Sequence, residues 1–465
     1  MRRFRWLIAI LLLLAMIAAA CGDDDSTTAD EPADEPADEP ADEPADEPAD
    51  EPADEPADEP AAMLTDVGVD DETIKIGLLA DLTGIFSGLV VPLTDGAEAY
   101  FDRLNASGGV AGGRQIDYIT VDTVYDVPTH LEFYDQFASD GGDGVAFIGF
   151  STGSPHTAAI RADLAADGLG AIPLSWNSSW ATDESANIFE WCTPYCVEAM
   201  NGLSWLAEQN DASTVAIISF PSDYGEDGAL GAKIAADQLG LEVVFDGQGA
   251  VVPGADQGPV IAGIVDSDPD IVWTTINSTT LAEIIGGANA GGYEGKWGGN
   301  GPSYAPQLMG TDVAPLLDAD YTHFAPYPGL AGVDSPGMDD VLAMMRENRP
   351  DAPFIGVYVI SWIQGEIVRQ GLEAAAAAGD LTREGIINAI QNNEIDMQGV
   401  IPNLNYSGDP NDQITRSSFV FDISADAYSA DATVQDDVGD GTVLIDPAYL
   451  SAAAEAWEYE PCFEI

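Results

Sequence analysis

The chain has 465 residues and a formal net charge of −67 at pH 7, from 81 acidic and 14 basic side chains. This charge argues against binding to nucleic acid or to anionic lipid surfaces, because both are themselves negatively charged. We interpret it as an adaptation to high salt, which screens the repulsion between acidic groups.

The first 21 residues have the order of an export signal. Arg2, Arg3 and Arg5 precede an apolar core at residues 7–17, and Ala18-Ala19-Ala20-Cys21 follows. The last four residues resemble a bacterial lipobox, in which the cysteine is lipidated and becomes the mature N-terminus. The resemblance implies an exported protein that Cys21 anchors to the outer face of the cell membrane. An ordinary cleaved signal peptide is the alternative.

An acidic tether is predicted at residues 22–62. The unit Ala-Asp-Glu-Pro occurs eight times in succession from Ala29 to Pro60. It has almost no apolar surface to bury, and its prolines interrupt helices and sheets, so the segment should be disordered and extended. The remainder is too long for one core, and we expect two lobes. It contains no second apolar segment long enough to span a membrane.

Three cysteines remain after Cys21. In an exported protein, the short spacing favours a disulfide between Cys192 and Cys196, which leaves Cys462 free; a bridge from one of the two to Cys462 is the alternative. No histidine lies near this pair in the sequence, and there is no phosphate-binding glycine loop. We therefore expect neither a metal nor a cofactor.

The folded part opens with alternating strands and helices. We predict strands at residues 73–79 and 115–122, helices at 96–105 and 129–138, and a third strand within 144–150. This β-α-β-α-β order is typical of a doubly wound parallel sheet.

The third strand leads into a polar turn, residues 149–155, and a helix at 156–166. We expect Ser154 to cap this helix, with Pro155 at its first position. Free N–H groups at a helix start favour an anion or a polar ligand group. The turn also matches G-x-S-x-G, the nucleophile motif of α/β-hydrolases, with Ser151 as the nucleophile.

Several motifs together resemble type I periplasmic binding proteins of ABC transporters, in particular the leucine/isoleucine/valine-binding cluster. They are Ile74-Lys75-Ile76-Gly77, Leu82-Thr83-Gly84, Asn-Ala-Ser-Gly-Gly-Val-Ala-Gly-Gly-Arg at 105–114, and Asp223-Tyr224-Gly225-Glu226. The resemblance implies two Rossmann-like α/β lobes, three hinge crossovers near 189–196, 321–328 and 398–405, and a ligand in the cleft. The N-terminal lobe would comprise 71–190 plus 327–397, and the C-terminal lobe 191–326 plus 398–465.

Ligand-binding residues are expected where strands end, because open α/β sheets bind ligands at the carboxyl ends of their strands. The candidates are Ser151, Thr152, Gly153, Ser154, Trp176, Asn177, Ser178, Ser179, Tyr224 and Asn277. Their hydroxyl groups suit a carboxylate or amide, and the aromatic rings suit an apolar tail. Ser154 has an alternative role as a helix cap only, and Trp176 as a core residue.

One departure concerns the acidic residue that amino-acid binders of this family supply for the ligand's ammonium group. The corresponding loop here, residues 298–303, has no acid. Asp223, Glu226 or Glu294 would have to substitute, or the ligand lacks an ammonium group and is an amide or carboxylic acid. A branched-chain amino acid remains the leading hypothesis.

The resemblance therefore implies a substrate-binding protein, not an enzyme, that passes a small molecule to the permease subunits of an ABC importer. Two alternatives are an exported serine hydrolase using Ser151 and a receptor that reports ligand occupancy to a membrane sensor. For the hydrolase, His323 is the only distant histidine after the serine.

Overall fold

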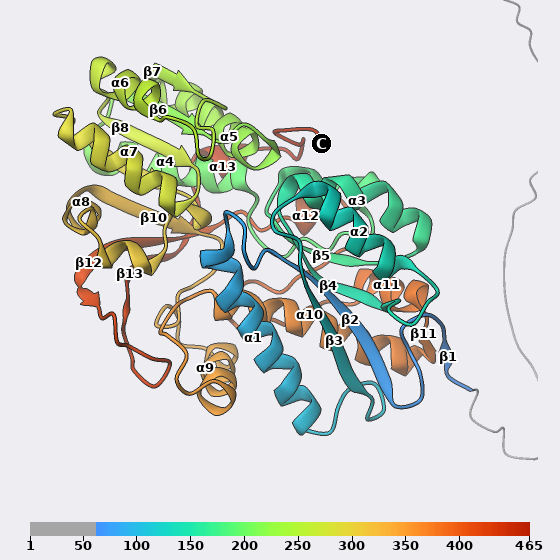
Figure 1. The fold of residues 1–465 in the computed structure, drawn as a ribbon. Helices are drawn as coiled ribbons and strands as arrows, with labels where there is room; N and C mark the ends of the chain where they lie inside the picture. The colour runs from blue at the N-terminus through green and yellow to red at the C-terminus, as the bar shows by residue number, and fades with distance from the viewer. Residues whose placement is uncertain (1–61) are drawn as a thin grey trace, which may run out of the picture. The chain divides into compact units, whose positions relative to one another are not determined.

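The computed structural model of the protein describes residues 62–465. The predicted signal segment, its Cys21 and all but the last residue of the acidic tether lie outside the described residues. Figure 1 shows two β-sheets in the described part, each with helices on both faces. No helix within residues 62–465 is long and apolar enough to cross a membrane.

The first sheet is parallel and has the strand order β3-β2-β4-β5. Its strands are β2 (Thr73–Ala80), β3 (Gln115–Asp122), β4 (Phe147–Thr152) and β5 (Ala171–Leu174). All residues of β4 and β5 are buried, as expected for parallel strands covered on both faces. Because the strands are parallel, their carboxyl ends lie along one edge of the sheet.

Two layers of helices cover this sheet. One layer joins α1 (Ser87–Ala106) to three helices from later in the chain: α9 (Pro336–Asn348), α10 (Tyr358–Ala378) and α11 (Arg383–Asn392). The other contains α2 (Val127–Ala138) and α3 (Ser154–Asp167). A short parallel pair, β1 (Leu64–Thr65) with β11 (Asp380–Leu381), lies beside α11.

The second sheet has the order β13-β12-β10-β9-β8-β6-β7. Five strands are parallel: β6 (Thr214–Ser219), β7 (Glu242–Gly247), β8 (Ile271–Thr275), β9 (Lys296–Gly299) and β10 (Tyr321–Ala325). The last two, β12 (Ser418–Tyr428) and β13 (Asp440–Tyr449), are antiparallel and form one edge.

Helices also cover both faces of the second sheet. One face carries α4 (Tyr195–Asn210), α5 (Asp223–Leu239) and the short α13 (Ala452–Ala456). The other carries α6 (Gly258–Ser267), α7 (Ser278–Ala290) and α8 (Ala314–Asp320). The short helices η3 (Gly301–Ser303) and η4 (Pro306–Gly310) follow β9.

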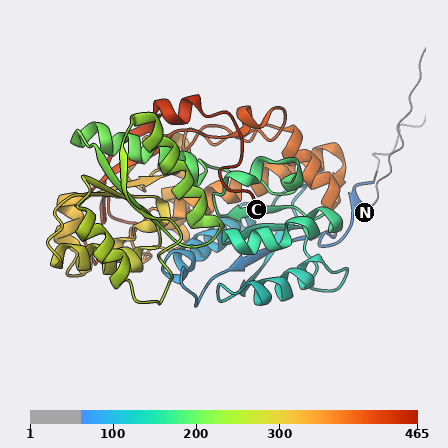
Figure 2. The same cartoon turned by 90° about the horizontal axis from the view of Figure 1, so that it is seen from above.

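The C-terminal segment returns to the first sheet's side of the molecule. The Tyr459 hydroxyl donates to the Ser178 carbonyl oxygen at 2.8 Å, and the Ser179 hydroxyl donates to the Phe463 carbonyl oxygen at 2.7 Å. Arg161 of α3 donates to the carbonyl oxygen of Ile465, the last residue. Figure 2 shows the end of the chain beside the helices that cover the first sheet. These hydrogen bonds join residues that lie 281 to 304 positions apart in the sequence.

The predicted α/β fold is confirmed, with local differences at the ends of elements. For example, β4 continues to Thr152, beyond the predicted end at 150. Helix α1 begins at Ser87, nine residues before the predicted start, although Pro92 lies inside it. The predicted cap of α3 is wrong by one residue, because Gly153 is the N-cap and Ser154 is already helical. Gly153 has φ +94°, a conformation that residues with a Cβ rarely adopt, so the chain turns there.

Candidate ligand-binding site

A cavity lies between the carboxyl ends of the first sheet's strands and the starts of α4, α5 and η3. It encloses about 350 Å³ of empty space, part of it open to solvent. The lining residues are Phe86, Leu89, Val90, Tyr125, Thr152, Gly153, Ser154, Leu174, Trp176, Tyr195, Tyr224 and Pro302. None of them carries a charged side chain, so the cavity suits a mainly apolar ligand with one polar group.

The polar end of the cavity is the junction between β4 and α3. The Thr152 hydroxyl is buried and has no hydrogen-bond partner within residues 62–465. The Ser154 hydroxyl lies 2.7 Å from that of Ser175. Helix α3 begins at this point, and the first N–H groups of a helix lack partners within it. A ligand oxygen here would meet a hydroxyl donor and a helix start at the same place.

Gly153 allows the Thr152 hydroxyl and the start of α3 to approach the cavity. A Cβ at this position would lie 2.6 Å from His156 Nδ1 and 2.8 Å from the Tyr125 ring. Tyr125 itself has φ +52°, and its neighbour Val124 has φ +49°. Two successive non-glycine residues in this region indicate a strained backbone. The Tyr125 ring packs against Phe86, with the ring centres 4.9 Å apart.

The far wall of the cavity is aromatic and combines Tyr195 and Tyr224, from helices of the second sheet, with Trp176, which follows β5. The ring centres of Tyr224 and Tyr195 are 4.8 Å apart, and those of Tyr195 and Trp176 are 5.2 Å apart. The Tyr224 hydroxyl lies 2.9 Å from the Ile276 carbonyl oxygen and 3.0 Å from Asn300 Oδ1. Because the hydroxyl is engaged there, Tyr224 offers its ring to the cavity.

Half of the residues expected to bind the ligand line this cavity: Thr152, Gly153, Ser154, Trp176 and Tyr224. The structure places the other five elsewhere. Ser151 Oγ is fully buried, 2.8 Å from Thr157 Oγ1 and 3.2 Å from His130 Nε2. Asn277 Oδ1 caps α7 by accepting the Thr280 N–H at 3.0 Å.

The remaining three residues hold the loop after β5 in place. Asn177 accepts the Ser179 N–H at 2.8 Å and donates to the Asp223 carbonyl oxygen at 3.0 Å. The Ser178 hydroxyl donates to Asp227 of α5, and that of Ser179 binds the C-terminal segment. These hydrogen bonds connect the loop to elements of the second sheet.

The predicted ligand-binding residues also did not include every residue that lines the cavity. Phe86 and Tyr125 follow β2 and β3, so the rule of carboxyl strand ends would have found them had it been applied to the first two strands. Pro302 lies in the loop at 298–303 that follows β9, which the sequence analysis had considered only for an acidic residue. Tyr195 has no such local signal, because it lies at the start of α4 and not at a strand end.

A buried acidic side chain lies beside the loop at residues 298–303, which itself contains no acidic residue. Glu198 of α4 accepts the Gly301 N–H on Oε1 at 3.0 Å, while its Oε2 has no partner in the part of the chain that the structure describes. Burial raises the pKa of Glu198 well above its usual range, which favours the neutral acid. Asp223, Glu226 and Glu294 are not among the lining residues.

The profile of one protein family, described as periplasmic binding protein, matches residues 73–428. The chain belongs to the periplasmic binding protein family. This match covers the first sheet, all strands of the second sheet except β13, and all lining residues of the cavity. The chain is thus a member of a family of binding proteins, as the motifs led us to expect.

Known proteins support this assignment. A curated relative, the Leu/Ile/Val-binding protein homolog 7 of Brucella melitensis, is 22% identical over 329 residues, which cover 67% of this chain and 80% of the relative. The structure of a fatty acid ABC transporter substrate-binding protein from Thermomonospora curvata is 26% identical, with a TM-score of 0.76, and covers 87% of this chain and 99% of that one.

A further structure, a branched chain amino acid ABC transporter protein from Thermus thermophilus with bound valine, shares the fold. It is 16% identical, with a TM-score of 0.70, and covers 83% of this chain and 99% of that one. The protein is thus a substrate-binding protein of the ABC-transporter type, and the ligands in the printed names of its relatives differ.

The serine-hydrolase alternative has no support in the geometry of this binding protein. Ser151 does have a histidine neighbour, His130, but its hydroxyl is fully buried and is absent from the cavity lining. His130 Nδ1 has no partner among the described residues, so no carboxylate orients the ring. Burial lowers the pKa of His130 to about 3, and we assign the pair to the core.

The predicted disulfide between Cys192 and Cys196 is wrong. Cys196 is bonded to Cys462, with the two Cα atoms 6.3 Å apart, and Cys192 is a buried free thiol. The returning C-terminal segment brings Cys462 to the first turn of α4, whereas Cys192 Sγ lies 3.5 Å from Glu190 Oε1. The sequence spacing could not reveal this, because the partner lies 266 residues away.

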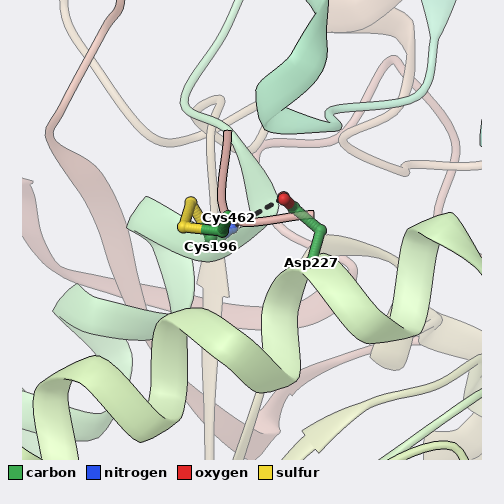
Figure 3. A group of neighbouring side chains, drawn as sticks. All are labelled: Cys196, Asp227 and Cys462. Atoms are coloured by element: carbon green, nitrogen blue, oxygen red, sulfur yellow. Dashed lines mark hydrogen bonds between the residues drawn. A yellow bond between two sulfur atoms is a disulfide. The ribbon is translucent and has the colours of Figure 1, made fainter. Parts of the chain in front are cut away.

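Asp227 lies beside this disulfide (Figure 3). Its carboxylate accepts the Cys196 N–H at 3.1 Å and the Ser178 N–H at 3.3 Å. Burial raises the pKa of Asp227 to about 7, although these hydrogen bonds act in the opposite direction. Since both sulfur atoms are in the disulfide, neither is a thiolate that could bind a metal together with Asp227.

Proposed function

We propose that this protein is the lipid-anchored substrate-binding protein of an ABC importer and that its ligand is a small carboxylic acid with an apolar body. One observation carries the proposal: the cavity has an unpartnered hydroxyl and a helix start at one end and uncharged, mostly aromatic walls elsewhere. Such a helix start favours an oxyanion, and the walls favour hydrocarbon.

The uncharged lining also disfavours a ligand that carries an ammonium group. An amino acid would bury its ammonium in a cavity whose lining offers no carboxylate, and burial of an unpaired charge is costly. Branched-chain amino acids are carboxylic acids with apolar bodies and so belong to the proposed class. The corresponding acids without an ammonium group fit the lining better. The name of the Thermomonospora relative supports a carboxylic acid, and that of the Thermus protein supports an amino acid.

We propose that the three connections between the two sheets act as hinges, near 189–196, 321–328 and 398–405. Ligand contacts from both sides, Thr152 on one and Tyr224 on the other, would then favour the closed form. Closure would create the surface that the permease subunits recognise. Lipidation at Cys21 and the acidic tether would keep the domain near the permease.

Isothermal titration calorimetry with matched ligands tests the ligand class. Leucine, 4-methylpentanoate and 4-methylpentanamide share one apolar body and differ only in their polar groups. We expect 4-methylpentanoate to bind more tightly than the other two. Tighter binding of leucine would restore the amino-acid hypothesis. If no member of this set binds, and neither member of the matched pair 3-phenylpropanoate and phenylalanine binds, the proposed class is overturned.

A further inference from the structure

A second cavity adjoins the first. It encloses about 550 Å³ of empty space, part of it open to solvent, and lies between the start of α1 and the strands β10, β12 and β13. Its lining comprises Gly88, Leu89, Tyr304, Ala305, Pro306, Gln307, His323, Ala325, Tyr327, Gly329, Ile355, Gly356, Val357, Phe421, Asp440 and Thr442. Neither the family match nor the relatives' names assign a role to this space.

Leu89 connects the two cavities. It is the one residue that lines both, and it lies in the first turn of α1 directly after the exposed Gly88. The two cavities share the start of α1 as a common wall, and a ligand chain that passes Leu89 from the first cavity would enter the second. We refer to the two cavities together as the cleft.

One wall of the second cavity is aromatic and buried. The ring centres of Tyr304 and His323 are 5.3 Å apart, and those of His323 and Phe421 are 5.8 Å apart, so the three form a continuous surface. Each is less than a tenth exposed. A surface of this kind gains free energy when it is covered by hydrocarbon, because water is removed from both partners.

The histidine and the aspartate in the lining do not favour a charged ligand. Burial lowers the pKa of His323 to about 3, so the ring is neutral at pH 7. Burial also raises the pKa of Asp440, whose Oδ1 already accepts the Thr442 N–H at 3.0 Å and its hydroxyl at 2.7 Å. No lysine or arginine lines the cavity.

We infer that the second cavity is the tail subsite of this cleft and holds the hydrocarbon chain of an extended monocarboxylate whose head group lies at Thr152. The inference rests on the proposed function, which it deepens from a small acid to an acid with a long apolar chain. Leu89 is the residue that such a chain would cross.

A chain-length series tests the inference by calorimetry: butanoate, hexanoate, octanoate and decanoate. Each methylene buried in the tail subsite should tighten binding by about three- to fourfold. The ω-amino analogue of octanoate should bind more weakly than octanoate, since its ammonium would be desolvated. An affinity that does not rise with length, or a preference for the ω-amino analogue, would overturn the inference while leaving the proposed function intact.

Gly88→Leu is the variant that should block the second cavity. A Cβ at Gly88 meets no atom within 4 Å, so a side chain can be added at the cavity mouth without a clash. We expect octanoate affinity to fall at least tenfold while butanoate affinity stays unchanged. Gly142→Leu is the matched control, because its Cβ also meets nothing and it is absent from both linings.

A second variant, Gly329→Ala, tests the same cavity in case Gly88→Leu does not fold. A Cβ at Gly329 would lie 3.4 Å from Thr442 Oγ1 and 3.7 Å from the Phe421 ring, which are tolerable contacts, so Gly329→Ala narrows the cavity from within. Selective loss of octanoate binding in both variants supports the inference. Equal loss for both acids, or no loss, overturns it, and failure of every carboxylate to bind the wild type overturns both this inference and the proposed function.

Discussion

Ser151 and Thr152 are neighbours at the end of β4, yet their hydroxyls lie in different surroundings. Ser151 Oγ is 2.8 Å from Thr157 Oγ1 inside the core, whereas Thr152 Oγ1 lines the cavity and lacks a partner in the described chain. Successive side chains of a strand point to opposite faces, so only one of the two can serve the ligand.

Substitutions at Thr152 and at Ser151 should therefore have opposite effects on the free energy of unfolding of the unliganded protein. Thr152→Val should weaken ligand binding by about 1–3 kcal/mol, roughly five- to 150-fold, because it removes a hydrogen-bond donor. It should also raise the free energy of unfolding of the unliganded protein, since a buried hydroxyl without a partner is costly. Calorimetry and urea denaturation measure the two effects.

Ser151→Ala is the matched control. It should lower the free energy of unfolding by about 1 kcal/mol, through loss of the hydrogen bonds to His130 and Thr157, and leave ligand affinity unchanged. A loss of affinity in Ser151→Ala as large as in Thr152→Val would contradict this assignment.

The disulfide predicts a large effect on stability. Replacing Cys196 and Cys462 together by alanine should lower the free energy of unfolding by about 2–5 kcal/mol, because the bond closes a long loop in the unfolded chain. Cys192→Ala serves as the control, and its effect should be smaller. Peptide mapping of the unreduced protein should recover residues 196 and 462 in one linked fragment; a link between 192 and 196 would refute the pairing.

Glu190 predicts a dependence of stability on pH. Its Oε1 accepts the Trp191 N–H at 2.8 Å, its Oε2 has no partner in residues 62–465, and burial raises its pKa to about 8. The native state therefore keeps a proton that the unfolded state releases near pH 4.5. This contribution is fully present below pH 4.5 and is lost as the pH rises to about 8, by an amount on the order of 4 kcal/mol.

Glu190→Gln isolates that contribution, because the amide cannot ionise and keeps an oxygen for the Trp191 N–H. Urea denaturation at fixed high salt measures the unfolding free energies of wild type and variant. Between pH 5 and pH 8, the unfolding free energy of the wild type should fall relative to that of the variant. Parallel pH curves for the two proteins would show that Glu190 does not titrate in this range.

The net charge of −67 predicts that salt stabilises the protein. Raising KCl from about 0.1 to 2 M should raise the melting temperature steadily, because screening weakens repulsion among the acidic side chains. Choline chloride should act similarly if ionic strength is the cause. A melting temperature that does not respond to either salt would argue against adaptation to high salt.

The local elements of the fold were predictable because their signals lie within short stretches of chain. Strands β2 and β3 were expected at nearly the observed bounds. The early start of α1 was missed, since Pro92 conceals the helical pattern of its first two turns. The turn predicted at 149–155 is shorter than expected, because β4 continues to Thr152 and α3 begins at Ser154; of its residues, Thr152, Gly153 and Ser154 line the cavity.

By itself, the sequence determined the order of strands and helices, the family motifs, the extreme acidity and the polar turn between β4 and α3. Only the tertiary structure decided that Thr152 rather than Ser151 lines the cavity, that Tyr195 completes its wall, and that Cys196 pairs with Cys462. The physical reason is the range of each signal. Periodicity and capping act over a few residues, whereas cavity walls and distant disulfides depend on how whole elements pack.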